Sequence, residues 1–195
     1  MITSIDELDF SKQYTYADYL TWKFDERVEL IHGWISTMSP APLVNHQRVL
    51  IKFAAQIVNF LEDKSCDVFA APFDVRLTNK RKNVANNSIQ SVVQPDICVI
   101  CDETKLDKRG CIGAPDWVIE ILSQGNSKKE MQEKFSLYEE NGVREYWIVF
   151  PIHFAVQVFD LVNDKFTFRS FYTKGDMIPV GIFEDFAIDS KKMFS

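Results

Sequence analysis

The sequence predicts an α/β protein, bordering on α+β, in which a mixed β-sheet is flanked by helices. Two observations predict this class: two long helical patterns, 45–63 and 127–141, separate the strands, and the strands are of two kinds. Continuous apolar runs such as 116–122 are typical of strands covered on both faces, whereas alternating runs around short turns are typical of antiparallel hairpins. The 195 residues, 46% of them hydrophobic, are enough for one domain, 1–195, with its own core.

The N-terminal region predicts a short helix followed by a hairpin. Thr15 and Asp18 form a capping signature for a helix that ends near Phe24. Two extended runs within 28–38 flank His32-Gly33, and a two-residue turn of this type is typical of a hairpin.

The central region predicts the longest helix and three strands. A proline-containing connector, 39–42, leads to Asn45, which is expected to cap a helix running to about Asp63. Apolar residues recur along this helix at helical spacing, namely Leu50, Phe53, Ala54, Ile57 and Leu61. Strands are expected at 68–71, 75–77 and 92–101, the last entered through Pro95, with polar loops at 79–90 and 102–114.

The C-terminal region predicts a strand, a second long helix and an antiparallel hairpin. The strand, 116–122, is almost continuously apolar. The helix opens at Ser127 and ends at Asn141-Gly142, a pair typical of a helix C-terminus. The elements expected after it are a strand at 144–150 and a hairpin at 154–172 that turns at Asn163-Asp164.

The charge and the ends of the chain exclude several classes of protein. A net charge of −6, from 22 basic and 28 acidic residues, excludes a strongly basic nucleic-acid coat protein but not an enzyme with one local basic patch. No apolar run approaches the ~18 residues needed to cross a membrane, so no membrane association is expected. Residues 1–10 lack the pattern of a signal peptide, which predicts an intracellular, cytoplasmic protein.

Four cysteines are expected to be free, reduced thiols in that compartment. Cys98-x-x-Cys101 has the spacing of half a zinc site, but it falls in an apolar run that predicts a strand. Side chains three residues apart on a strand point to opposite faces. Buried, inert thiols are therefore favoured over a structural zinc site.

Two apolar strands each contain an acidic residue, Asp96 in one and Glu120 in the other. A carboxylate among Val, Ile and Leu side chains is costly unless it is paired or bound to a metal. Two such acids on neighbouring strands can share a divalent cation, and oxygen ligands suit Mg²⁺ or Mn²⁺. The alternative is that each acid lies at a strand end and meets water or a backbone N–H.

These acids belong to a series of motifs that resembles one protein family. Pro95-Asp96, followed 24 residues later by Glu120-Ile121-Leu122, resembles the PD-(D/E)XK nuclease pattern. Over about 15–185 the chain is similar to the Uma family of putative restriction endonucleases, a branch of that superfamily. The motifs that carry the resemblance are Val28-Glu29-Leu30-Ile31-His32-Gly33-Trp34, Met38-Ser39-Pro40-Ala41-Pro42, His46-Gln47, Gln94-Pro95-Asp96, Gly113-Ala114-Pro115-Asp116, Val118-Ile119-Glu120-Ile121-Leu122-Ser123, Lys134-Phe135-Ser136-Leu137-Tyr138 and Asn141-Gly142-Val143-Arg144-Glu145-Tyr146-Trp147.

The resemblance implies a restriction-endonuclease-like fold and a metal-dependent phosphodiesterase site. Asp96 and Glu120 match the metal-binding acids of the family, and Glu29 matches a third acid that joins them. Lys134 matches a lysine that has moved onto the following helix, and Leu122 stands where the superfamily's lysine usually lies. Phe150 departs from the branch, which usually has an Asp before the Pro at this point.

A case for Lys134 can also be made from the helix alone. It lies at the edge of an apolar stripe formed by Met131, Phe135 and Tyr138, from which it can reach toward the strand ends. The alternative is a surface ion pair with Glu130, four residues earlier.

The remaining candidates each have a functional and a structural interpretation. His46, in the first turn of the longest helix, suits a phosphate contact or a third metal-ligand position, or else a capping or packing role. The basic loops Lys80–Lys82 and Lys105–Arg109 flank the Asp96 strand and suit a basic lip for DNA, or else are ordinary solvated loops.

The sequence therefore predicts a metal-dependent DNA endonuclease with Asp96, Glu120, Glu29 and Lys134 as its site and Mg²⁺ or Mn²⁺ as its cofactor. RNA is not separated from DNA as the substrate. The alternative is a nuclease-like fold that has lost catalysis and serves as a binding or regulatory module. Because nucleases that cut both strands often pair two identical subunits, a homodimer is expected.

Overall fold

The computed structural model describes residues 2–38, 43–81, 84–123 and 127–195, and its strands form two six-stranded sheets. The first sheet has the order β2 (Trp34–Thr37), β1 (Val28–Ile31), β5 (Ser91–Val93), β4 (Val75–Leu77), β8 (Gly110–Ile112), β7 (Leu106–Asp107). The second sheet has the order β12 (Lys165–Thr173), β11 (Ala155–Val162), β10 (Glu145–Phe150), β9 (Trp117–Ile121), β6 (Ile97–Ile100), β3 (Asp67–Ala70). Strands β13 (Met177–Pro179) and β14 (Ala187–Asp189) pair separately.

Four α-helices accompany the sheets: α1 (Tyr16–Tyr19), α2 (Val44–Leu61), α3 (Lys128–Asn141) and α4 (Ser190–Met193). Short 3-10 helices are η1 (Ile5–Glu7), η2 (Asn86–Ser88) and η3 (Glu103–Lys105). In the part of the chain that the structure describes, no helix has the length and apolar composition that crossing a membrane requires.

Helices α2 and α3 cover opposite faces of the second sheet, which follows from the alternation of side chains along its strands. On one face, Phe53 of α2 packs against Trp117 and Trp147. On the other face, Leu137 of α3 lies in one buried cluster with Val118. Both faces of β9 are therefore buried, as its continuous apolar run predicts.

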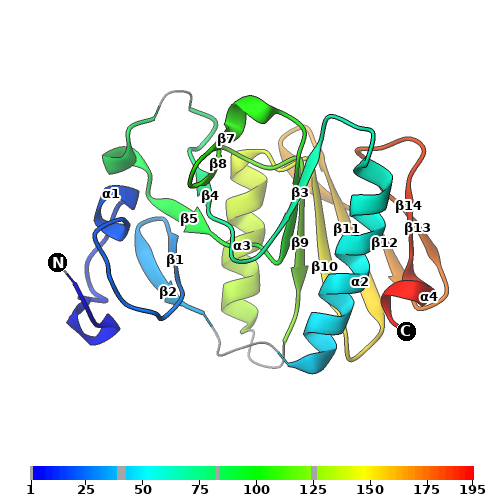
Figure 1. Cartoon of the computed structure of the whole chain (residues 1–195), viewed down its shortest axis with the longest axis horizontal. Coiled ribbons are helices and arrows are strands. Elements are labelled where there is room, and N and C mark those ends of the chain that lie inside the picture. The colour runs from blue at the N-terminus through cyan, green and yellow to red at the C-terminus, as the bar shows by residue number, and fades with distance from the viewer. Residues whose placement is uncertain (1, 39–42, 82–83, 124–126) are drawn as a thin grey trace.

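Helix α3 also lies between the two sheets (Figure 1). Its buried cluster includes Ile31 and Val93 of the first sheet beside Val118 and Ile148 of the second. Strands β9 and β10 are parallel and are joined through α3, whereas β6 runs antiparallel to β9. A side chain of α3 can thus contact both sheets at once.

Most predicted elements are confirmed. The mixed sheet, both long helices and both hairpins are present, and each hairpin turns through two residues with positive φ, such as Asn163 and Asp164 at 51° and 60°. Ser127 caps α3, and Gly142 ends it in the left-handed conformation. The predicted connector 39–42 lies outside the described residues.

Four details of the predicted elements are wrong. The single strand expected at 92–101 is two strands, β5 and β6, because the chain passes from one sheet to the other at Pro95, which has no N–H to donate. Helix α1 ends at Tyr19 and not near Phe24, and the N-cap of α2 is Leu43 and not Asn45. The predicted loop at 102–114 contains the short hairpin of β7 and β8.

The prediction of four free thiols is wrong, because Cys66 and Cys101 form a disulfide. Strands β3 and β6 pair antiparallel with Asp67 opposite Ile100, so their neighbours Cys66 and Cys101 also face each other across the pair. Cys98 and Cys111 are free and buried. Cys98 and Cys101 do lie on opposite faces, as predicted: Cys98 faces α3 and Cys101 packs on the α2 side.

Candidate active site

Asp96 and Glu120 lie side by side at one end of the second sheet. In the antiparallel pairing of β6 with β9, Ile97 is opposite Ile119, so the next pair outward is Asp96 with Glu120. Asp96, the residue before β6, accepts a hydrogen bond from the backbone N–H of Ile121 at 2.7 Å through Oδ2. The prediction that the two acids are neighbours is confirmed. Glu120 lies within β9, whereas Asp96 lies at a strand end and meets a backbone N–H, which is the alternative that the sequence left open.

Glu120 is buried, with 8% of its surface exposed. Its Oε1 accepts hydrogen bonds from Lys134 Nζ at 3.2 Å and from the Tyr138 hydroxyl at 2.6 Å. Burial raises the pKa of Glu120 to about 7, with the charges of Asp96 and Glu29 adding to the rise and Lys134 opposing it. Burial therefore disfavours the ionised form of this carboxyl group even though Lys134 lies beside it.

Glu29 comes from the other sheet and meets the same lysine. It is 1% exposed, and its Oε1 lies 3.1 Å from Lys134 Nζ and accepts the Gln94 N–H at 2.8 Å. Lys134 is itself 6% exposed. Burial alone would lower its pKa, but Glu120 and Glu29 outweigh that effect and raise it. The alternative of an exposed surface pair with Glu130 is wrong, because the ammonium group is buried between two acids from two sheets.

His46 of α2 is paired with Asp96. Its Nε2 lies 3.2 Å from Oδ1 of Asp96. Burial lowers the pKa of His46, but the hydrogen bond and charge of Asp96 and the carbonyl of Ile121 more than compensate, so the pKa is raised. The buried Nδ1 has no hydrogen-bond partner among the described residues. His46 thus holds Asp96 in place, and a role toward phosphate or metal stays a prediction.

Tyr138 is the site residue that the sequence did not single out, because the helical pattern predicts it only as part of an apolar stripe. The signal was its position: it lies four residues after Lys134 on the same helix face. A buried tyrosine hydroxyl needs a partner, and here that partner is the carboxylate of Glu120.

Replacing Tyr138 by Phe is expected to raise the pKa of Glu120 further, because the lost hydrogen bond stabilises the ionised form. Binding of Mn²⁺, which needs the carboxylate, should then require a higher pH, as calorimetric titration between pH 6 and 9 would measure. Tyr14→Phe is the matched control, since it removes a hydroxyl that accepts the Asp9 N–H at 3.0 Å in another cluster. An unchanged pH midpoint in Tyr138→Phe would contradict this role.

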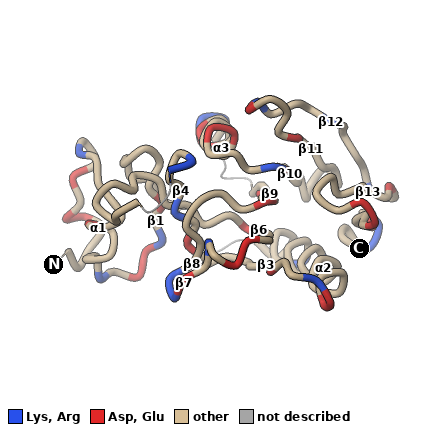
Figure 2. Tube along the Cα trace, turned by 90° about the horizontal axis from the view of Figure 1, so that it is seen from above, with Lys and Arg blue, Asp and Glu red and all other residues tan. Residues whose placement is uncertain are grey.

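The predicted basic lip is wrong in position. The loop 102–109 follows the end of β6 that is opposite Asp96, and Lys105 there donates to the carbonyl of Ala114 at 2.8 Å. Lys80 lies near the C-terminal end of α3, where it pairs with Asp164 at 2.7 Å, and Lys82 lies outside the described residues. Figure 2 shows blue segments beside β4 and beside β7 and β8, at this far end. The loops flank the Asp96 strand in sequence but not at the end that carries the acid.

The donor set fits a hard divalent cation. Mg²⁺ in proteins commonly uses one or two carboxylates and takes its other ligands from water and substrate phosphate. Asp96 and Glu120 could supply such a pair, and among the described residues no group of three or more His, Cys, Asp or Glu side chains is placed to hold a metal ion. A bound cation would favour the ionised form of Glu120, whose pKa burial raises.

Comparisons with known proteins give a family from a family model and a fold from a solved structure. A family model described as Uma2, putative restriction endonuclease, matches residues 16–190. The uncharacterized protein slr1290 of Synechocystis sp. (strain ATCC 27184 / PCC 6803 / Kazusa) is 23% identical over 150 residues, 75% of this chain and 74% of that protein. The crystal structure of a putative nuclease belonging to DUF820 from Anabaena variabilis ATCC 29413 matches with a TM-score of 0.70 at 20% identity, covering 93% of this chain and 97% of that one. The predicted nuclease-like α/β fold is confirmed.

Proposed function

Because the chain belongs to the Uma2 family of putative restriction endonucleases, we propose that it is a metal-dependent endonuclease that hydrolyses phosphodiester bonds of DNA at Asp96 and Glu120. One observation carries the proposal: Glu29 of the first sheet and Glu120 of the second converge on the buried Lys134, and Asp96 lies next to Glu120 in the register of the second sheet. Such a cluster is costly for stability alone, and perturbed buried acids of this kind gather at functional sites.

Each residue has a role that follows from its contacts. Asp96 and Glu120 would hold Mg²⁺ or Mn²⁺, which when bound polarises a phosphoryl oxygen and lowers the pKa of a bound water. His46 and the Ile121 N–H orient Asp96, and Tyr138 orients Glu120. Lys134 stabilises the negative charge that develops on the phosphoryl group, and Glu29 keeps this lysine protonated and in place.

The arrangement of the helices supports an anionic substrate at this end of the molecule. Helices α2 and α3 both begin where β9 ends (Figure 1), and helix N-termini attract negative charge. Two exposed cations lie near the starts of these helices, Arg48 in the second turn of α2 and Lys128 in the first turn of α3. They take the place of the basic loops that the sequence suggested.

A cleavage assay tests the proposal directly. Supercoiled plasmid, single-stranded DNA and RNA are incubated separately with the protein in Mg²⁺, in Mn²⁺ and in EDTA. A Mg²⁺ concentration of about 5–10 mM is enough to fill a weak site. We expect metal-dependent cleavage of DNA and none in EDTA. Binding of DNA without cleavage in any metal would favour the alternative of a catalytically inactive binding module, and preferential cleavage of RNA would change the substrate.

A homodimer would supply two such sites for cutting both strands. Apolar side chains stand exposed at seven-residue spacing along α2: Val44, Ile51 and Val58, at 65%, 63% and 52%. Two copies of α2 packed antiparallel about Ile51 would set Val44 of one copy against Val58 of the other, as a two-fold interface requires. We expect a dimer by light scattering and a monomer for Ile51→Glu, with Phe168→Glu on β12 as the control. A monomeric wild type, or loss of the dimer only in the control, would contradict this interface.

A further inference from the structure

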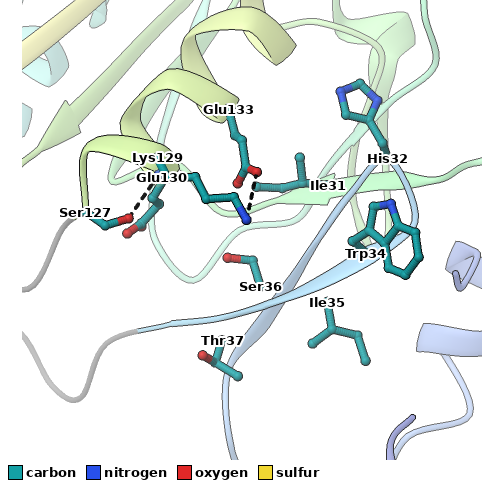
Figure 3. Close-up of a pocket in the computed structure, with 10 residues that line it drawn as sticks. All are labelled: Ile31, His32, Trp34, Ile35, Ser36, Thr37, Ser127, Lys129, Glu130 and Glu133. Carbon is teal, nitrogen blue, oxygen red and sulfur yellow. Dashed lines mark hydrogen bonds and ion pairs between the residues drawn. The ribbon is translucent and has the colours of Figure 1, made fainter. Parts of the chain in front are cut away.

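A groove of about 600 Å³ runs beside the candidate active site, between β2 and the first turns of α3 (Figure 3). Its walls include Trp34, Ser36 and Thr37 from β2 and Lys129, Glu130 and Glu133 from α3. We call it the Trp34 groove. Its volume is in the range of small-molecule sites, which fits one nucleoside but not a DNA duplex.

The strand register makes this groove continuous with the catalytic cluster. Glu29 of β1 is directly opposite Ser36 of β2, and Ile31 is opposite Trp34. Directly opposite residues project from the same face of a sheet, so Ser36 and Trp34 share the face on which Glu29 meets Lys134. On the helix side, Glu130 lies one turn before Lys134. A strand whose phosphate approached the Lys134 end of the site would have its neighbouring nucleoside over the groove.

The chemistry of the walls selects a base rather than a phosphate. Trp34 is 46% exposed and offers an aromatic surface on which a base can stack. Glu130 and Glu133 would repel a phosphate, and Lys129 is already 3.7 Å from Glu133. Carboxylates do accept hydrogen bonds from exocyclic amino groups of bases, as Glu does from cytosine N4.

We propose that the Trp34 groove binds an unpaired nucleobase of the DNA strand next to the scissile phosphate, stacked on Trp34 with its amino group toward Glu133. The base is unpaired because the groove has room for one nucleoside, and laying the face of a base on Trp34 requires that base to leave the stack of the duplex. This inference rests on the proposed nuclease function and names its substrate class: single-stranded DNA, or a duplex that opens at the cut.

The test measures binding without cleavage. A fluorescein-labelled strand of twelve deoxycytidines and an abasic strand of equal length are titrated by anisotropy in EDTA. Since base stacking on an aromatic side chain is worth about 1–3 kcal/mol, Trp34→Ala should weaken binding of the cytidine strand roughly 5- to 150-fold and leave the abasic strand unchanged. Trp34→Phe should keep most of the affinity. Phe171→Ala, which removes an aromatic ring that is 52% exposed on β12, is the matched control.

The readouts separate this inference from the nuclease proposal. The proposal for the Trp34 groove is overturned if the wild type binds both strands equally, if it binds neither, or if Trp34→Ala has no effect. This holds whatever the wild type does to DNA in Mg²⁺. Selective weakening by Trp34→Ala supports it even if the wild type cleaves nothing, in which case only the catalytic proposal fails. Circular-dichroism melting of each variant shows that the fold is intact, which the exposure of Trp34 predicts.

Discussion

Replacing Asp96 by Asn, or Glu120 by Gln, is expected to reduce metal-dependent DNA cleavage by a factor on the order of 10³. Each change keeps the size of the side chain and removes one of the two charged ligands of the cation. The cation's stabilisation of transition-state charge is worth several kcal/mol, and each ~1.36 kcal/mol is tenfold in rate. The rate of single-turnover cleavage and the affinity for Mn²⁺ should therefore both decrease in each variant.

Asp116→Asn is the matched control for both acid variants. Asp116 is also a buried acid, and it lies just before the start of β9, at the other end of the strand from Glu120. It accepts the Cys101 N–H at 2.8 Å and pairs with Arg144 at 3.1 Å. Its removal is expected to lower the melting temperature but not the rate of cleavage. Cleavage at the wild-type rate by Asp96→Asn or Glu120→Gln would show that the acid replaced has no part in the mechanism.

The Glu120 variant also carries a pH signature in the metal-free protein. The folded-state pKa of Glu120 is about 7, above the ordinary value of 4.5, so the folded state binds this proton more tightly than the unfolded state. Its contribution to stability is present below about pH 4.5 and is lost as the pH rises through about 7. Relative to the wild type, Glu120→Gln should thus be more stable at pH 8 than at pH 5 in urea unfolding.

Replacing Lys134 by Met is expected to lower cleavage by about 10²–10³, the usual effect of losing one donor to transition-state charge. The change removes the ammonium group that lies 3.1 Å from Glu29 and 3.2 Å from Glu120. Because Lys134 opposes the rise in the pKa of Glu120, its loss moves that pKa further up. Mn²⁺ binding should therefore weaken at pH 7 and recover at pH 9, while cleavage stays low at both.

Stability provides the check on this variant, since two buried acids lose their common cation. Removing one partner of a buried ion pair commonly costs about 3–5 kcal/mol. Lys134→Arg retains the charge and serves as the folded comparison, and Lys191→Met in α4 is the control for loss of an exposed lysine. Wild-type cleavage by Lys134→Met would leave the lysine with a structural role only.

Local patterns in the sequence determined the helices, the hairpins and half of the site. The helical spacing of Phe53 and Ile57 predicts α2, and Ser127 and Gly142 mark the ends of α3, because capping and periodicity act within a few residues. Asp96 and Glu120 were also recognisable from local sequence, because each is a single acid within an apolar run. Their adjacency needed only that these two strands pair.

Only the tertiary structure decided how distant segments meet. The pairing of Lys134 with Glu29 needs both sheets in place around α3, and the Cys66–Cys101 disulfide needs β3 beside β6. The basic loops are adjacent to Asp96 in sequence, yet the loop at 102–109 follows the far end of β6, about 13 Å away along a four-residue strand. A sequence pattern carries the preferences of neighbouring residues. The partner of a buried charge is set by packing between segments, and that is where this site is assembled.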